Sequence, residues 1–185
     1  MLIQKENLDD NQLRLVSSVF EATNRMSRLN QGLLLISKIE NNQFIHTEEI
    51  NVALLLDNTI EHFEEMIDHR GIIVSKNYQY PTSIEMNPVL AEIFITNLVS
   101  NAIRHNNYKG RIEVLVQKGL VTIANTGQPL KTDPIELFKR FRKSNNNPDS
   151  VGLGLSVVQK IANLYQMKVD YIYKEGYHTL IISFS

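Results

Sequence analysis

The chain has 185 residues, of which 43% are hydrophobic and 21% are charged, and its formal net charge is −1. This composition is typical of a globular domain, and the near-zero charge argues against bulk attraction to nucleic acid or to a membrane surface. The lack of cysteine excludes disulfides and thiolate chemistry. No apolar run approaches the roughly 18 residues that span a bilayer, so we expect a cytoplasmic location, with any membrane anchor elsewhere in a longer parent protein.

The N-terminal region is dominated by one helical pattern, which runs without proline from residue 8 to residue 41. Its apolar positions follow alternating three- and four-residue steps after the first heptad, as in the seam of a coiled coil. These positions are Leu8, Leu15, Val19, Ala22, Met26, Leu29, Leu33 and Ile36. A helix about 50 Å long cannot bury its own stripe, so we expect dimerisation through a helical bundle, with packing on its own domain as the alternative. Gly32, within the seam, should weaken it by about 1 kcal/mol.

A second region with mixed helix and strand patterns follows a short connector at residues 41–47. Thr47 is predicted to cap a helix, because the two glutamates that follow it would favour the first turn. That helix is predicted to end at Gly71. The apolar segment GIIVSKNY (71–78) then predicts a strand.

The remaining elements continue this mixture of helices and strands. Asn87-Pro88 predicts the start of a helix, and RIEVLVQ and LVTIANT predict a hairpin around Lys118-Gly119. A short helix from Asp133-Pro134, a longer one from about Leu155 and two final strands, MKVDYIY and TLIISFS, complete the pattern. This order predicts an α+β fold, a two-layer sandwich with a mixed sheet covered on one face by helices and preceded by the long N-terminal helix.

The segment NLVSNAIRHN (97–106) places Asn97, Asn101 and Arg104 on one stripe of an otherwise apolar helix. Asparagine is a weak helix former, and a buried amide must find hydrogen-bond partners. An asparagine oxygen can coordinate a hard cation such as Mg²⁺, and an arginine can pair with phosphate. The alternative is an asparagine pair that hydrogen-bonds to the backbone of a neighbouring element.

Three further segments carry features that could contact a ligand. ANTGQPL (124–130) ends a strand, and its Gly127 allows close backbone approach. ELFKRFRKS (136–144) is the most basic stretch and could form a lid that offers cations to an anionic ligand. SVGLGLSVV (150–158) places Gly152 and Gly154 before a helix, whose first N–H groups can hold phosphate. Taken singly, the first two are also explained as an ordinary strand-ending turn and an amphipathic turn, and the third is a weak signal.

In their order and spacing, the four segments resemble the ATP-binding catalytic domain of two-component sensor histidine kinases, a branch of the GHKL ATPase superfamily. They are similar to the N, G1, F and G2 boxes of that family, and the resemblance covers about residues 47–185. The segment LLLISKIEN resembles part of the second helix of the dimerisation and phosphotransfer domain. The resemblance therefore implies two domains, the bundle helix with its connector (1–46) and the catalytic domain (47–185).

The resemblance implies a site for ATP and Mg²⁺ in which Asn101 is the metal ligand, and it implies no catalytic residue within the chain. The implied ATP-binding residues are Asn97, Asn101, Arg104, His105, Asn125, Gly127, Lys143, Gly152, Leu153, Gly154 and Leu155. Some positions depart from the family pattern. Asn125 replaces an acidic residue that accepts a hydrogen bond from the adenine amino group, and Pro129 and Ser150 replace glycines.

The family's phosphoacceptor is a histidine followed by an acidic residue, and none of the five histidines has that setting. The resemblance thus implies a protein-histidine kinase fragment that transfers the γ-phosphate of ATP to a histidine outside this chain. The implied partners are the dimerisation and phosphotransfer domain of the parent kinase and a downstream response regulator. We also expect a homodimer through the N-terminal helix and no nucleic-acid partner.

Two alternative functions remain open. A GHKL ATPase or serine kinase would share the fold, but its N box begins with a glutamate base where this chain has Asn97. A water or hydroxyl nucleophile benefits from such a base, whereas an imidazole acceptor needs less help, which favours a histidine kinase. The other alternative is a degenerate module that only dimerises or binds partners, because Asn125, Pro129 and Ser150 depart from the family pattern.

Overall fold

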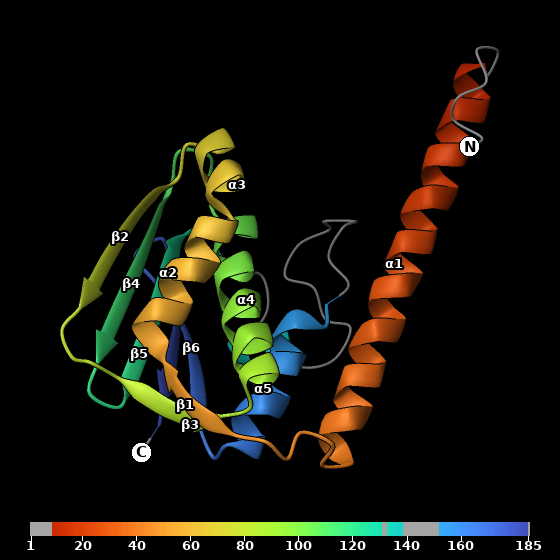
Figure 1. Cartoon of the computed structure of the whole chain (residues 1–185). Helices are drawn as coiled ribbons and strands as arrows, with labels where there is room; N and C mark the ends of the chain where they lie inside the picture. Colours follow the sequence, from red (N-terminus) through yellow and green to blue (C-terminus); the bar gives the residue numbers. More distant parts are fainter. Residues whose placement is uncertain (1–8, 131–132, 139–151, 185) are drawn as a thin grey trace.

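The computed structural model describes residues 9–130, 133–138 and 152–184. Figure 1 shows a sheet with helices packed on one side and a long N-terminal helix beside them. In chain order the elements are α1 (Asp10–Glu40), β1 (Glu48–Asn51), α2 (Val52–His62), α3 (Glu64–His69), β2 (Ile73–Tyr78), β3 (Ser83–Met86), α4 (Pro88–Arg104), β4 (Arg111–Gln117), β5 (Leu120–Thr126), η1 (Pro134–Phe138), α5 (Gly154–Leu164), β6 (Lys168–Lys174) and β7 (Tyr177–Ser183).

The central sheet has five strands in the order β2-β4-β5-β7-β6. β2 and β4 pair in parallel, and the other neighbours pair antiparallel, so the sheet is mixed. The predicted hairpin is confirmed, because β4 and β5 pair Gln117 with Leu120 across the turn Lys118-Gly119. Gly119 has a φ of 68° there, a left-handed conformation that glycine adopts without steric cost.

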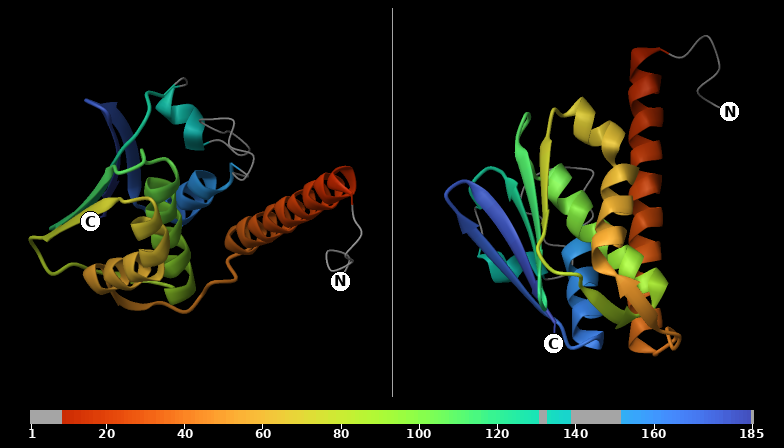
Figure 2. Two further views of the ribbon diagram at one scale, coloured as in Figure 1. Left: turned by 90° about the horizontal axis from the view of Figure 1, so that it is seen from above. Right: turned by 60° about the vertical axis from the view of Figure 1, so that its left-hand side comes forward.

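The hydrophobic core lies between the sheet and the helices α2, α4 and α5, which cover one face of it (Figure 2). Along β4, the buried Ile112, Val114 and Val116 alternate with exposed or half-buried neighbours, as expected for a sheet covered on one side. Leu98 of α4 and Ile161 of α5 are fully buried opposite the sheet. The predicted two-layer α+β sandwich with a mixed sheet is confirmed.

The two ends of α4 are held by specific hydrogen bonds. Oδ1 of Asn87 accepts from the first free N–H groups of the helix at 3.1 and 3.2 Å, and Pro88 occupies the first turn, as predicted. At the other end, the guanidinium of Arg70 donates to the carbonyl oxygens of Ile103 and of Asn106. Together these contacts fix the helix that carries the predicted asparagine stripe.

The predicted long helix is confirmed as α1, which continues past the rest of the molecule (Figure 1). Its C-terminal part packs on the domain, where Ile36 and Ile39 are buried and the helix contacts α5. Its N-terminal part exposes the predicted seam, with Leu15 and Met26 exposed by 66% and 74%. Although α1 is long, no helix within the described ranges is apolar enough to qualify as a membrane span.

The predicted helix cap at Thr47 is wrong. Glu48–Asn51 forms the strand β1, which pairs antiparallel with β3, and neither strand was predicted. Oδ1 of Asn51 caps α2 instead, accepting from the N–H of Leu54 at 3.0 Å. Helical geometry is then interrupted at Phe63, which separates α2 from α3. Pairing with a distant strand therefore overrides the local helical pattern after Thr47.

Candidate functional site

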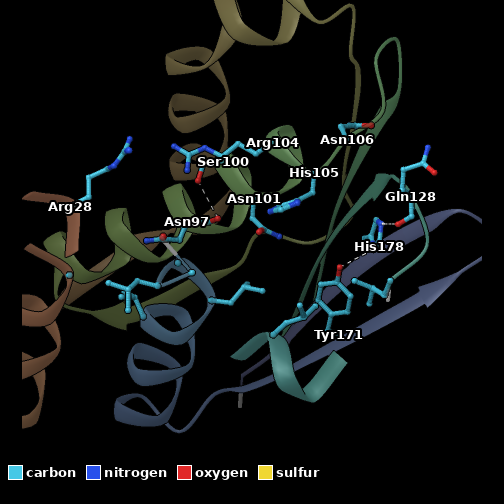
Figure 3. Close-up of a pocket in the computed structure, with 18 of the residues that line it drawn as sticks. Arg28, Asn97, Ser100, Asn101, Arg104, His105, Asn106, Gln128, Tyr171 and His178 are labelled. Atoms are coloured by element: carbon cyan, nitrogen blue, oxygen red, sulfur yellow. Dashed lines mark hydrogen bonds between the residues drawn. The ribbon is translucent and has the colours of Figure 1, made fainter. Parts of the chain in front are cut away.

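A cavity of about 490 Å³ lies between the C-terminal half of α4, the start of α5, the segment after β5, the strands β6 and β7, and α1 (Figure 3). Most of the ligand-binding residues predicted from the sequence line this cavity. They are Asn97, Asn101, Arg104, His105, Gly152, Leu153, Gly154 and Leu155. Asn125 and Gly127 do not line it. The predicted Lys143 and the divergent Ser150 lie outside the described residues.

The two asparagines of α4 have different surroundings. Asn97 donates from Nδ2 to the carbonyl oxygen of Ile93 at 2.7 Å, within its own helix. Its Oδ1 faces Gly154, where an added Cβ would lie 3.0 Å away, so this glycine allows α5 to approach α4 closely. Asn101 points into the cavity, and within the described part of the chain its side chain makes no hydrogen bond. Its amide is therefore available to a ligand.

The turn before α5 brings backbone N–H groups to the cavity. Gly152 has a φ of 71°, and the helix begins at Gly154, with Leu153 as its N-cap residue. The carbonyl oxygen of Leu153 accepts from the N–H of Val157 and from Oγ of Ser156, both at 2.9 Å. Within the described residues, no side chain caps the first N–H groups of α5. An uncapped helix N-terminus of this kind is a ready site for an anion.

The long helix α1 supplies one wall of the cavity. A Cβ added to Gly32 would lie only 2.7 Å from Cδ1 of Leu153, so Gly32 leaves the space that the buried Leu153 fills. The glycine therefore has a packing role beside its expected cost to the helix. Arg28, one turn earlier, lines the same cavity and adds a cation to it (Figure 3).

The opposite end of the cavity is formed by Tyr171, His178 and Gln128, which the sequence analysis missed. His178 is only 6% exposed. Its Nε2 lies 2.8 Å from the carbonyl oxygen of Gln128, and its Nδ1 lies 2.8 Å from the hydroxyl of Tyr171. A Cβ at Gly127 would overlap the imidazole ring, so only glycine at this position leaves room for His178.

The two predicted residues that do not line the cavity, Asn125 and Gly127, both lie beside His178. Asn125 and His178 are direct partners in the β5–β7 ladder, so their side chains lie on the same face of the sheet. Asn125 is 3% exposed, and its Nδ2 donates to the carbonyl oxygen of Thr126 at 2.9 Å. Gly127 packs against the ring of His178. The register of β5 against β7 is the signal that could have revealed His178.

Burial sets the protonation states at this end of the cavity. It lowers the pKa of His178, although a hydrogen bond to a backbone carbonyl acts in the opposite direction. Burial also lowers the pKa of His105, and electrostatic repulsion from the neighbouring His178, when that ring is protonated, and from Arg104 and Arg70 lowers it further. Burial raises the pKa of Tyr171. At neutral pH both imidazoles are therefore neutral and the phenol keeps its proton.

An α/β sandwich whose cavity combines amides, cations and a helix N-terminus with aromatic side chains suits a phosphorylated ligand. Residues 86–184 match the family described as Histidine kinase-, DNA gyrase B-, and HSP90-like ATPase. The match covers more than half of the 185 residues, and the chain belongs to this family.

Curated relatives are sensor proteins that are longer than this chain. The chain is 26% identical over 187 residues to the Heme sensor protein HssS of Staphylococcus aureus (strain MSSA476), covering 97% of this chain and 41% of HssS. It is 27% identical over 170 residues to HssS of Staphylococcus saprophyticus, covering 89% of this chain and 37% of that protein. The chain thus spans about two fifths of the length of these relatives.

Solved histidine kinases share the fold. The histidine kinase AdeS of Acinetobacter baumannii aligns with a TM-score of 0.75 at 21% identity, covering 100% of this chain and 88% of AdeS. The cytoplasmic segment of histidine kinase QseC aligns with a TM-score of 0.63 at 22% identity, covering 88% of this chain and 93% of that segment. The resemblance inferred from the four sequence segments is confirmed: the chain belongs to the ATPase family that includes histidine kinases, is similar to longer sensor proteins, and shares its fold with solved histidine kinases.

Proposed function

We propose that the cavity binds ATP with Mg²⁺ and that the domain transfers the γ-phosphate to a histidine outside this chain. The observation that carries this proposal is the polarity of the cavity. One end combines amides, cations and an uncapped helix N-terminus, and the other combines aromatic and apolar side chains. A nucleotide has the same polarity, with a charged triphosphate and a flat base. The polar end would hold the phosphates, and the end formed by Tyr171 and His178 would hold the base.

The phosphates would be bound mainly by backbone groups and arginines. Gly152 and Gly154 line the polar end at the start of α5, so no large side chain at these positions would separate a phosphate from the first N–H groups of the helix. Arg104 is exposed at the end of α4, and Arg28 faces the cavity from α1. Guanidinium groups form strong charge-assisted hydrogen bonds with phosphate. His105, neutral and half-buried between the two ends, would contact the ribose.

A Mg²⁺ ion would be held by phosphate oxygens and by Oδ1 of Asn101. Among the described residues there is no group of three or more His, Cys, Asp or Glu side chains that could hold a metal on its own. Mg²⁺ in nucleotide sites typically has few protein ligands and relies on the substrate phosphates. Asn101 fits this role because its amide lines the cavity. The bound ion would neutralise part of the phosphate charge.

The side chain at position 97 supports a histidine acceptor. An amide has no useful basicity at neutral pH, and Nδ2 of Asn97 already donates to Ile93. A water or hydroxyl nucleophile benefits from a general base, whereas a neutral imidazole is already nucleophilic. His178 is buried and hydrogen-bonded through both ring nitrogens, which makes it unsuitable as the acceptor. None of the five histidines is followed by an acidic residue, as the family's acceptor is, so we place the phosphoacceptor outside this chain.

We assign residues 1–46 to the second helix and connector of a dimerisation and phosphotransfer bundle, and residues 47–185 to the catalytic domain. The exposed seam of α1 supports this division, because Leu15 and Met26 would be buried by a partner helix. The proposed partners are the rest of that bundle, a second copy of α1 and a response regulator. We expect the domain to act in the cytoplasm, where ATP is available.

The experiment that tests this function supplies the missing acceptor. The chain is mixed with γ-labelled ATP, Mg²⁺ and a separately produced phosphotransfer domain of the parent protein. We expect acid-labile phosphate on that domain, and none when its acceptor histidine is replaced by alanine. Release of inorganic phosphate without transfer would instead favour an ATPase. Lack of both binding and turnover would favour a degenerate binding module.

A further inference from the structure

Tyr171 and His178 form a pair on the cavity wall in which the position of each proton is fixed. The carbonyl oxygen of Gln128 can only accept a hydrogen bond, so Nε2 of His178, 2.8 Å away, carries a proton. Burial lowers the pKa of His178, so the ring is neutral at neutral pH and Nδ1 is unprotonated. The hydroxyl of Tyr171, 2.8 Å from Nδ1, therefore donates its proton to His178.

The surrounding residues hold this pair in place. The ring of His178 fills the space beside Gly127 and is 6% exposed. The ring of Tyr173 packs against it with the two centroids 4.7 Å apart. Burial raises the pKa of Tyr171, so the phenol stays protonated and remains a donor to the imidazole. The direction of the Tyr171 O–H bond is thus set by the protein and not by the ligand.

This arrangement gives the cavity a hydrogen-bond preference. Because its proton is committed to His178, the oxygen of Tyr171 offers only lone pairs to a ligand. Adenine carries an exocyclic amino group, which donates. Guanine carries a carbonyl oxygen at the corresponding position, which accepts. A carbonyl oxygen placed against the Tyr171 oxygen would leave both groups unsatisfied, and burying such groups is costly.

We propose that Tyr171, positioned by His178, is the residue that selects adenine over guanine in this cavity. The inference rests on the proposed function and names the chemistry by which the same site recognises its base. Asn125 is less suited to this role, since it is 3% exposed and does not line the cavity. Its Nδ2 is also bonded to the carbonyl oxygen of Thr126. The residues proposed to recognise the base therefore lie on β6 and β7, and not on β5, where the sequence placed Asn125.

The test measures dissociation constants of the whole chain for Mg²⁺·ATP and Mg²⁺·GTP by calorimetric titration. The chain without substitutions should bind ATP about tenfold more tightly than GTP. The reason is that the adenine amino group can donate a hydrogen bond to the Tyr171 oxygen, whereas the guanine carbonyl oxygen cannot. Tyr171→Phe removes the hydroxyl and keeps the ring. Its affinity for ATP should fall about fivefold, with no fall for GTP, so that most of the preference disappears.

Two further variants separate positioning from packing. His178→Phe keeps an aromatic ring and removes both nitrogens, which frees the Tyr171 hydroxyl to donate to guanine. The ratio of ATP to GTP affinity should therefore fall although Tyr171 is intact. Tyr173→Phe is the matched control, because Tyr173 packs against His178 and does not line the cavity. This variant should keep the full preference for ATP.

Several results would overturn the inference. One is equal binding of ATP and GTP by the unchanged chain. Another is an unchanged ratio of ATP to GTP affinity in Tyr171→Phe together with a lost preference for ATP in Asn125→Ala. That result would show that Asn125 on β5 recognises the base. These two results leave the proposed function intact. Failure of the unchanged chain to bind either nucleotide would overturn the proposed function and the inference with it.

Discussion

The cavity has a polar end and a base end, which is the end formed by Tyr171 and His178 that would hold the nucleobase. The two ends differ in how their residues are brought together. At the polar end, Asn97 and Asn101 lie one turn apart on α4, and short stretches of sequence place them. At the base end, Asn125 and His178 become neighbours only because β5 pairs with β7. Residues placed by a single helix form a pattern that can be read directly. Residues placed by a strand ladder depend on the register of the whole sheet.

The two ends also differ in how their polar groups are satisfied. Within the described ranges, the amide of Asn101 makes no side-chain hydrogen bond, and no side chain caps the N-terminus of α5. The polar groups of His178 and Tyr171 are instead bonded to each other and to the backbone. We therefore expect variants at the polar end to change the affinity for every nucleotide and variants at the base end to change the choice among them.

The largest effect is expected from Asn97→Glu, which would add a general base at the polar end. ATP hydrolysis should rise by about 100-fold if a bound water can use the new carboxylate. Phosphate release at saturating ATP measures the rate. Asn97→Gln is the control, because a longer amide provides no base and should leave hydrolysis unchanged. An unchanged rate in the glutamate variant would count against Asn97 as the position of a missing base.

Asn101→Ala should have the next largest effect, because it removes the proposed protein ligand of Mg²⁺. The affinity for Mg²⁺·ATP and Mg²⁺·GTP should fall in parallel by about ten- to hundredfold, the range for a lost contact to a charged group. Asn163→Ala, on the exposed side of α5, is the control and should change neither affinity. A loss confined to one nucleotide would contradict the proposed division between the two ends.

Gly152→Ala tests the backbone turn before α5 against a matched glycine. Gly152 and Gly176 have φ values of 71° and 82°, so alanine at either position should cost about 1 kcal/mol or more of stability. Only Gly152 lines the cavity, and a Cβ at Gly176 would meet no atom within 4 Å. Denaturant unfolding should therefore show similar losses, whereas nucleotide affinity should fall only in Gly152→Ala. Equal affinities in the two variants would argue against phosphate binding at this turn.

The smallest effect is expected on the pH dependence of stability, through the two buried histidines His105 and His178. His105 and His178 have lowered pKa values, so the unfolded chain takes up protons below the ordinary histidine pKa of 6.5 while the folded chain resists them. Their contribution to the free energy of unfolding is present above pH 6.5 and is lost as the pH falls through the folded pKa values. Urea unfolding at a series of pH values measures this. His178→Phe should flatten the dependence, and an unchanged slope would contradict a neutral His178.

The sequence predicts best the features that depend on neighbours along the chain. Asn87 and Pro88 start α4 as expected, and the hairpin around Lys118-Gly119 has the expected strands. The stripe of Asn97 and Asn101 faces the cavity because helical spacing alone places both on one side. These features need no knowledge of which distant segments of the chain pair.

The features that could not be predicted depend on contacts between distant segments. β1 exists because Glu48–Asn51 pairs with β3, although the glutamates after Thr47 favour a helix start when taken alone. Gly32 would count only as a helix-weakening residue without Leu153 packing against it. His178 looks like an ordinary strand residue until the β5–β7 register places it beside Asn125. Tertiary packing decides each of these cases.

The most direct test of the central claim is a titration of the unchanged chain with a fluorescent ATP analogue, with and without Mg²⁺. We expect saturable binding that is tighter with Mg²⁺ and is competed by ATP. Because Asn101 is the proposed metal ligand, the dependence on Mg²⁺ should be lost in Asn101→Ala. Absence of saturable binding up to millimolar nucleotide would show that the cavity is not a nucleotide site.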